Sequence, residues 1–174
     1  EKAIDFFEKA MDLQPGISRF YCNAGCAYRE LKQMAKATEY LQHAVDLDPN
    51  FATGHKYLGK LLHEQGRSSQ ALFHYERARE LYPTDPEVLN YLGLLAIHPF
   101  VAIHYFQDAL ALNPNYPEAY CNLGKELIKH QQINAAIECF REALRLDPDY
   151  KMAENCLNTT INHLRNEGKL NLQA

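Results

Sequence analysis

The sequence lacks an apolar segment long enough to cross a bilayer, because no apolar run approaches the ~18 residues that a membrane-spanning helix requires. It also lacks a surplus of basic residues: 18 Lys and Arg stand against 22 Asp and Glu, which gives a net charge of −4. Nucleic-acid binding needs a dense basic surface. The composition therefore predicts neither a membrane protein nor a nucleic-acid-binding protein.

Signatures of catalysis and of metal binding are also missing. The five cysteines are an odd count without a Cys-x-x-Cys motif, and Cys22 and Cys26, four residues apart, have no His pair at ligand spacing. We interpret the cysteines as small, partly buried thiols in a reducing compartment. Histidines, serines and aspartates show no triad arrangement, and the glycines form no phosphate-binding loop. The sequence predicts no enzyme, no metal site and no cofactor.

The sequence is rich in amphipathic helical pattern, which is clearest in the stretch 120–148. Its first half places apolar or small residues at three- and four-residue intervals, which line one face of a helix. Its second half repeats this spacing, and Pro148 ends it, because a proline disfavours helical geometry at the residue before it. The two sets are Tyr120, Leu123, Gly124 and Leu127, then Ala136, Ile137, Phe140, Ala143 and Leu144. The stretch predicts two packed helices joined by a short turn.

The same pattern recurs along the chain, and the prolines that close it give its period. They are 34, 34, 31 and 34 residues apart, at Pro15, Pro49, Pro83, Pro114 and Pro148. Each follows a helix in which alanine, an aromatic residue or leucine, and alanine again recur at helical spacing. This order of residues resembles the tetratricopeptide repeat, a 34-residue helix–turn–helix unit. Within 120–148 only Leu127 departs from the family pattern, at a position where tyrosine is typical.

The resemblance implies an all-α fold, a right-handed superhelical solenoid of helix–turn–helix repeats. Each unit of such an array buries its apolar face against its neighbours, so residues 1–166 are predicted to form a single array. It comprises a half repeat, four repeats and a capping helix, with the ranges 1–15, 18–49, 52–83, 86–114, 117–148 and 151–166. Residues 167–174 are predicted to be a frayed tail.

Two places in this scheme leave alternatives open. Residues 1–13 match only the second helix of a repeat, so either the sequence has a boundary or a disordered start here, or further repeats precede Glu1. The repeat 86–114 is three residues short, and the loss falls between Gly93 and Ala102. Either its turn is tight, or a flexible segment is absent around 94–100. The absent segment is favoured, because the loss of three residues should strain a packed pair.

In the family, the first helices of successive repeats line a concave groove that holds peptides or a partner's helix. The family's inward-facing positions carry more Lys and Arg than Glu in this chain, which favours an acidic partner. Asparagines there can pair with a peptide backbone, and tyrosines offer rigid apolar contact with a polar tip. The alternative is a solvated face without a ligand. The predicted partner-binding residues are Asn23, Lys56, Tyr57, Lys60, Asn90, Tyr91, Asn122 and Lys125.

Two specialised forms of the family are not matched. The carboxylate clamp of chaperone-binding members needs Lys-Asn where this chain has Cys22 and Asn23. The asparagine ladder of the O-GlcNAc transferase superhelix needs Asn in every repeat, whereas Tyr57 and Tyr91 interrupt it between Asn23 and Asn122. Neither of these specialised ligands is therefore predicted.

The predicted function is a non-catalytic scaffold for protein–protein interaction, which binds a peptide or helical segment of a partner in the concave groove. One alternative is the substrate-recruiting arm of a larger enzyme, such as a glycosyltransferase fusion, whose catalytic domain lies outside these residues. Another is self-assembly into a homo-oligomer through the open N-terminal helix, which would expose Phe6 or Phe7. A cytoplasmic location is expected, with the nucleus as the alternative.

Overall fold

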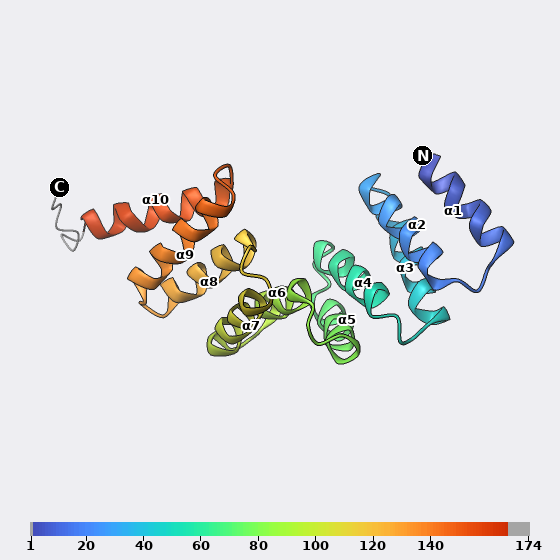
Figure 1. The fold of residues 1–174 in the computed structure, drawn as a ribbon, viewed down its shortest axis with the longest axis horizontal. Coiled ribbons are helices and arrows are strands. Elements are labelled where there is room, and N and C mark those ends of the chain that lie inside the picture. Colours follow the sequence, from blue (N-terminus) through green and yellow to red (C-terminus); the bar gives the residue numbers. More distant parts are fainter. Residues whose placement is uncertain (1, 167–174) are drawn as a thin grey trace. The chain divides into compact units, whose positions relative to one another are not determined.

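The computed structural model describes residues 2–166, with side chains described from Ile4 onward (Figure 1). Every regular element in that range is an α-helix, which confirms the predicted all-α repeat fold. The expected tail, 167–174, lies outside the described residues. The helices are α1 (Lys2–Leu13), α2 (Ser18–Glu30), α3 (Met34–Leu47), α4 (Ala52–Glu64), α5 (Ser68–Leu81), α6 (Pro86–Leu95), α7 (Pro99–Leu112), α8 (Pro117–Lys129), α9 (Ile133–Leu146) and α10 (Lys151–Asn166).

The chain divides into two compact units within α6. The first unit is Glu1–Tyr91 and holds α1 to α5 with the start of α6, and the second is Leu92–Ala174 and holds the remaining helices. In the first unit α2 packs on α3 and α4 on α5, with α1 against α2 and α3 against α4. In the second, α8 packs on α9, α7 on α8 and α10 on α9. The predicted single array over 1–166 stays a prediction.

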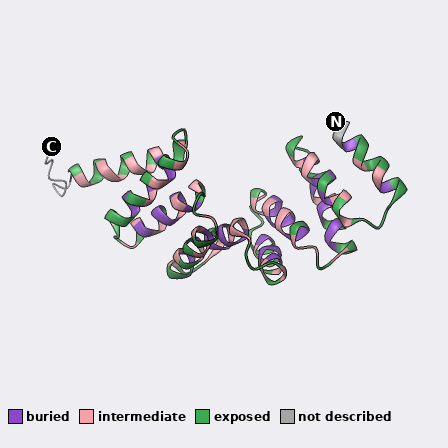
Figure 2. Cartoon of the chain, viewed as in Figure 1, coloured by how far each residue is buried: buried purple, intermediate pink, exposed green. Residues whose placement is uncertain are grey.

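Small residues let the two helices of each pair approach closely. The alanines Ala37, Ala71, Ala102 and Ala136 are at most 1% exposed, and Figure 2 shows such buried positions on the sides of the helices that face their neighbours. A Cβ atom added to the glycine of the first helix would lie 2.6–3.0 Å from a side chain of the second helix in every pair. Each helix pair therefore packs through the same contact, with glycine opposite leucine, tyrosine or phenylalanine.

The shortened repeat keeps this contact. Gly93 faces Phe106 as Gly124 faces Phe140, and an added Cβ would lie 2.6 Å from either ring. The three missing residues come from the first helix, because α6 has 10 residues where α2, α4 and α8 have 13. Three residues, Ala96, Ile97 and His98, connect the end of α6 at Leu95 to the start of α7 at Pro99. A tight turn is therefore compatible with the packed pair, because the shorter helix relieves the strain expected from the loss. An absent segment around 94–100 stays the alternative prediction.

Three of the turns within helix pairs end in the same left-handed cap. Lys32, Gly66 and Gln131 have φ of 58°, 74° and 59°. The backbone N–H of the following residue donates across the turn in each case, for example from Gln33 to the carbonyl of Tyr28 at 2.9 Å. This is the Schellman arrangement, which satisfies the last carbonyls of a helix. Of the three residues, only Gly66 adopts a positive φ without steric strain, because glycine has no Cβ atom.

Candidate functional site

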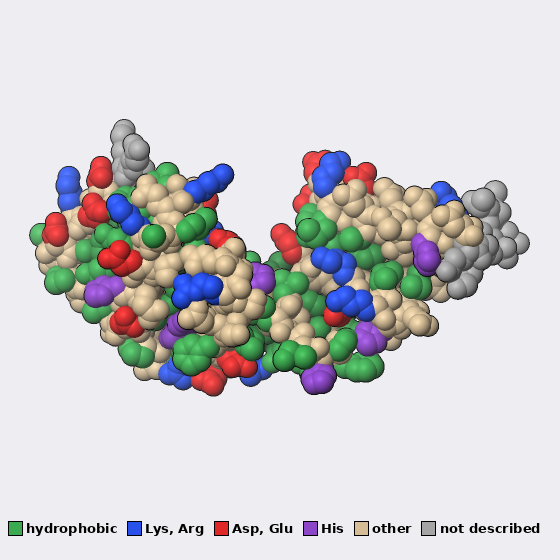
Figure 3. All heavy atoms as spheres, turned by 180° about the vertical axis from the view of Figure 1, so that it is seen from behind, with side chains coloured by type: hydrophobic (Ala, Val, Ile, Leu, Met, Phe, Trp, Pro, Cys, Tyr) green, Lys and Arg blue, Asp and Glu red, His purple; other side chains and the backbone are tan. Residues whose placement is uncertain are grey.

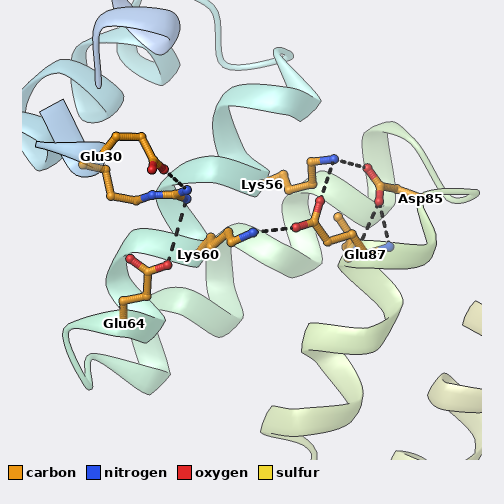
Figure 4. A network of polar contacts seen from close by, with 8 residues as sticks. Glu30, Lys56, Lys60, Glu64, Asp85 and Glu87 are labelled. Carbon is orange, nitrogen blue, oxygen red and sulfur yellow. Dashed lines mark hydrogen bonds and ion pairs between the residues drawn. The ribbon is translucent and has the colours of Figure 1, made fainter. Parts of the chain in front are cut away.

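A row of charged side chains crosses the first helices of the first unit (Figure 4). Lys56 Nζ lies 2.8 Å from Asp85 Oδ2 and 3.3 Å from Glu87 Oε2, and Lys60 Nζ lies 2.8 Å from Glu87 Oε1. These pairs join α4 to the start of α6. Arg29 joins α2 to α4 more loosely, with its guanidinium 4.0 Å from Glu64. We name Arg29, Lys56, Lys60, Glu64, Asp85 and Glu87 the inter-repeat network.

Asp85 belongs to this network because it also caps α6. Its Oδ1 accepts hydrogen bonds from the backbone N–H groups of Glu87 at 2.9 Å and Val88 at 3.2 Å, while Oδ2 faces Lys56. Aspartate is a preferred cap, and Pro86 in the first helical position needs no partner for a missing N–H. Asp85 was not among the predicted site residues, although Asp-Pro-Glu is a start signal for a helix.

The network neutralises its own charges. Burial would lower the pKa of Lys56, but its hydrogen bond to Asp85 raises that pKa above the ordinary value. Burial would raise the pKa of Glu87, but its hydrogen bond with Lys60 lowers it below the ordinary value. These contacts move the pKa values of Lys56, Lys60 and Glu87 in the direction that favours their charged forms. Two lysines stand against two carboxylates, so the basic lining expected from Lys56 and Lys60 is balanced within the first unit.

Tyrosine rings flank the network. Tyr91 stacks on Tyr75 with ring centroids 4.9 Å apart and planes 5° apart, and Lys60 Nζ lies 5.7 Å from the Tyr91 centroid. Lys56 Nζ lies 5.6 Å from the centroid of the Tyr57 ring. Ammonium groups at this distance are attracted to an aromatic face. Tyr57 and Tyr91 are half-buried and Asn23 is exposed, so these three predicted residues lie at the surface of the first unit.

Asn90 is the predicted residue that the structure places inside the protein. It is 4% exposed and has an interaction partner within the chain. The equivalent positions of other repeats hold Cys22 and Cys121, which are 1% and 0% exposed. Lys56, the fourth member, reaches the surface because its long side chain can bury its stem while the charged end stays outside. The family position of Asn90 is therefore a packing position in this chain.

The second unit holds the two remaining predicted residues. Asn122 is half-buried with a partner in the chain. Lys125 is exposed, with its Nζ 3.6 Å from Met152 Sδ on α10. It lies at a cleft of about 280 Å³ that also includes Phe140 of α9 and, from α10, Asn155, Cys156, Thr159 and Thr160. These α10 residues were not predicted as site residues, because α10 was expected to be a capping helix.

The cysteines are all free thiols in the structure. Cys22 and Cys26 hydrogen-bond to each other, and this bond, together with burial, raises the pKa of Cys22. The same bond lowers the pKa of Cys26. Burial raises the pKa of Cys121 and of Cys139 to about 11. Within residues 2–166, no group of three or more His, Cys, Asp or Glu side chains is placed to hold a metal ion.

The surface carries charges of both signs. On the face shown in Figure 3, acidic and basic side chains alternate with hydrophobic ones over each unit. Across the part of the chain that the structure describes, no helix is both long and apolar enough to pass through a membrane.

Comparisons with known proteins match this architecture. Models of the tetratricopeptide repeat match residues 18–51, 52–95 and 117–158, which together make up more than half of the chain. The human protein named Tetratricopeptide repeat protein 6 is 35% identical over an alignment that covers 45% of this chain. The chain spans only 16% of the length of that relative.

Solved structures share the fold. A structure of YrrB, described as a TPR protein with an unusual peptide-binding site, has a TM-score of 0.75 at 22% identity, and the match covers 94% of this chain and 86% of YrrB. A structure of MamA has a TM-score of 0.71 at 21% identity, with 83% and 86% covered. The repeated glycine contacts, the Schellman turns and these matches together establish that the chain belongs to the tetratricopeptide repeat family.

Proposed function

We propose that the chain is a non-catalytic scaffold that binds a peptide or a helical segment of a partner protein through the first helices of its repeats. These are α2, α4 and the start of α6 in the first unit, and α8 in the second. The observation that supports this most is the inter-repeat network. It fixes charged side chains from three successive first helices, and their exposed fractions of 16–40% leave part of most of them open to a ligand. Side chains held in place by the protein lose little freedom when a partner binds.

The chemistry of this row suits a polar, extended ligand. The lysines retain N–H groups beyond those bonded to Asp85 and Glu87, since an ammonium has three donors. Asn23 and Tyr57 add a backbone-pairing amide and a rigid ring. An acidic partner stays a prediction. Lys125 of the second unit would recognise it best, because Lys56 and Lys60 are already paired with carboxylates.

Site-specific photocrosslinking tests the proposal. A photoreactive phenylalanine derivative at Tyr57, beside the network, should crosslink a partner in a cell lysate, and the adduct can be identified by mass spectrometry. The matched control carries the same residue at Phe73, an exposed ring of α5. Adducts from position 57 that disappear when Lys60 is changed to alanine support the first-helix surface. Equal adducts from both positions would place the binding surface elsewhere.

Two alternative functions can each be tested separately. The chain covers a small part of its human relative, so a longer protein with a catalytic domain stays a proposal, which the full-length reading frame decides. Self-assembly through α1 would use Phe6, which is 68% exposed beside the ring of Phe7. Light scattering at several concentrations measures it, and a constant monomer mass would reject it. A cytoplasmic or nuclear location remains a prediction.

A further inference from the structure

We propose that the first unit has a second binding site, which takes an arginine-containing segment of a partner protein in a cleft between α1, α2 and α3. The cleft has a volume of about 740 Å³, which lies in the range of ligand pockets and exceeds one side chain. It is separate from the surface of the proposed function, because its Tyr21 lies two residues from Asn23 and so points to the opposite side of α2.

The cleft is lined by carboxylates from two helices. Glu8 and Asp12 come from α1, and Glu39 and Asp46 from α3. No lysine or arginine lines the cleft, and none of the four forms an ion pair within the described residues. Glu8 accepts a hydrogen bond from the Tyr28 hydroxyl at 2.8 Å, which leaves acceptor capacity on its carboxylate. Asp46 accepts a hydrogen bond from Gln42 Nε2 at 2.8 Å. The residues that line the cleft therefore carry a net negative charge.

Aromatic rings lie beside these carboxylates. The ring centroids of Tyr21 and His43 are 4.4 Å apart, and those of Tyr21 and Tyr40 are 6.3 Å apart. All three rings line the cleft. A planar guanidinium can stack on such rings and bind a carboxylate through two parallel hydrogen bonds, which an ammonium cannot do. Rings and carboxylates together therefore select arginine.

The next repeat carries an arginine at the position that is equivalent to His43 of the cleft. Thirty-four residues after His43 stands Arg77. Its guanidinium donates to Glu80 Oε2 and to Asn50 Oδ1, both at 2.9 Å. Glu80 is in turn the counterpart of Asp46. The chain thus supplies its own guanidinium to the α5 carboxylate and to the loop that follows α3, whereas the cleft beside α1 has the acidic residue without the arginine. An arginine from a partner would complete the same pattern.

Binding of a tetra-arginine peptide, acetylated and amidated at its ends, to the whole 174-residue chain tests the inference by calorimetry at physiological salt. The decisive variant is His43→Arg, which places a guanidinium of the chain where Arg77 stands in the next repeat. It should weaken peptide binding by about tenfold or more. The matched control, Gln107→Arg, adds the same charge on the exposed side of α7 in the second unit and should change affinity less than about twofold.

A second variant tests the same inference in case His43→Arg does not fold. Asp12→Asn with Glu39→Gln removes two exposed carboxylates of the cleft, keeps their shape and should also weaken binding by about tenfold. Circular dichroism verifies that each variant is folded. Equal losses in His43→Arg and Gln107→Arg, or failure of the unmodified chain to bind the peptide, would overturn the inference. Crosslinking from Tyr57 stays unchanged in these variants, so the two proposals can fail independently.

Discussion

Lowering the pH from 7 to 5 should destabilise the first unit through a buried pair of histidines, His55 on α4 and His74 on α5. They are 6% and 9% exposed, and their Nδ1 atoms are 2.9 Å apart. His55 Nε2 lies 3.2 Å from the carbonyl oxygen of Pro49, which can only accept, so this nitrogen carries the proton. The neutral His55 then accepts at Nδ1, and His74 donates from its own Nδ1.

Protonation opposes this arrangement. Burial, followed by the neighbouring His55, lowers the pKa of His74 from 6.5 to about 4, although Asp46 opposes the shift. Burial also lowers the pKa of His55, with Arg77 in the same direction and the Pro49 carbonyl and Asp48 against it. Because the folded pKa is lower than the unfolded one, stability is complete above pH 6.5 and is lost as the pH falls towards 4. For His74 alone, the loss at pH 5 is about 2 kcal/mol.

Native-state hydrogen exchange measures this loss locally, which matters because repeat proteins need not unfold in one step. The opening free energies of amides in α4 and α5 are compared at pH 7 and pH 5. The control is the double variant His55→Tyr with His74→Tyr, which restores the pair that Tyr21 and Tyr40 form one repeat earlier. The unmodified chain should lose about 2 kcal/mol more than the variant. An equal loss in both proteins would refute the reasoning.

Three further predictions concern the helix pairs and the network. Gly124→Ala should lower the free energy of unfolding by about 1–3 kcal/mol in urea titrations, because the new Cβ would lie 2.6 Å from Phe140, whereas Gly16→Ala meets nothing within 4 Å and should not. Lys32→Gly should raise the melting temperature, because it relieves about 1 kcal/mol of left-handed strain at φ 58°. Asp85→Ala should lower stability by about 1 kcal/mol more than Asp85→Asn, which keeps the helix cap.

The helices and their period could be predicted because their signals are local. Apolar residues at helical spacing define each face, and a proline such as Pro148 ends the second helix whatever surrounds it. The close contact of Gly124 with Phe140 follows the same logic, since both lie at fixed places in one repeat. The shortened α6 could not be predicted. Helix α6 is three residues shorter than the other first helices, and Gly93 still packs on Phe106. This outcome depends on how the two helices pack together, which no local pattern shows.

The candidate site was predicted less completely, because its side chains interact between repeats. Lys56 and Asp85 are 29 residues apart, and no local pattern shows that they meet. Asn90 was expected at the surface of the concave groove, because its position lines that groove in the family. The cysteines at the equivalent positions were a usable signal of burial, since free cysteine is among the residue types most often buried.

Equivalent positions of the repeats also differ in whether their charged side chains are paired, and this difference indicates where a partner would bind. Where one repeat carries a cation within reach of a carboxylate of the next, as Lys56 does with Asp85, the chain satisfies its own charges. Where the counterpart is absent, a charge remains for another molecule. Lys125, which lies against the thioether of Met152 and forms no ion pair among the described residues, leaves a cation in the second unit. Asp12 and Glu39 leave anions in the cleft of the first. Since long-range attraction depends on charge that is not already paired, these positions, more than the ordered network between them, should decide which partners approach each unit.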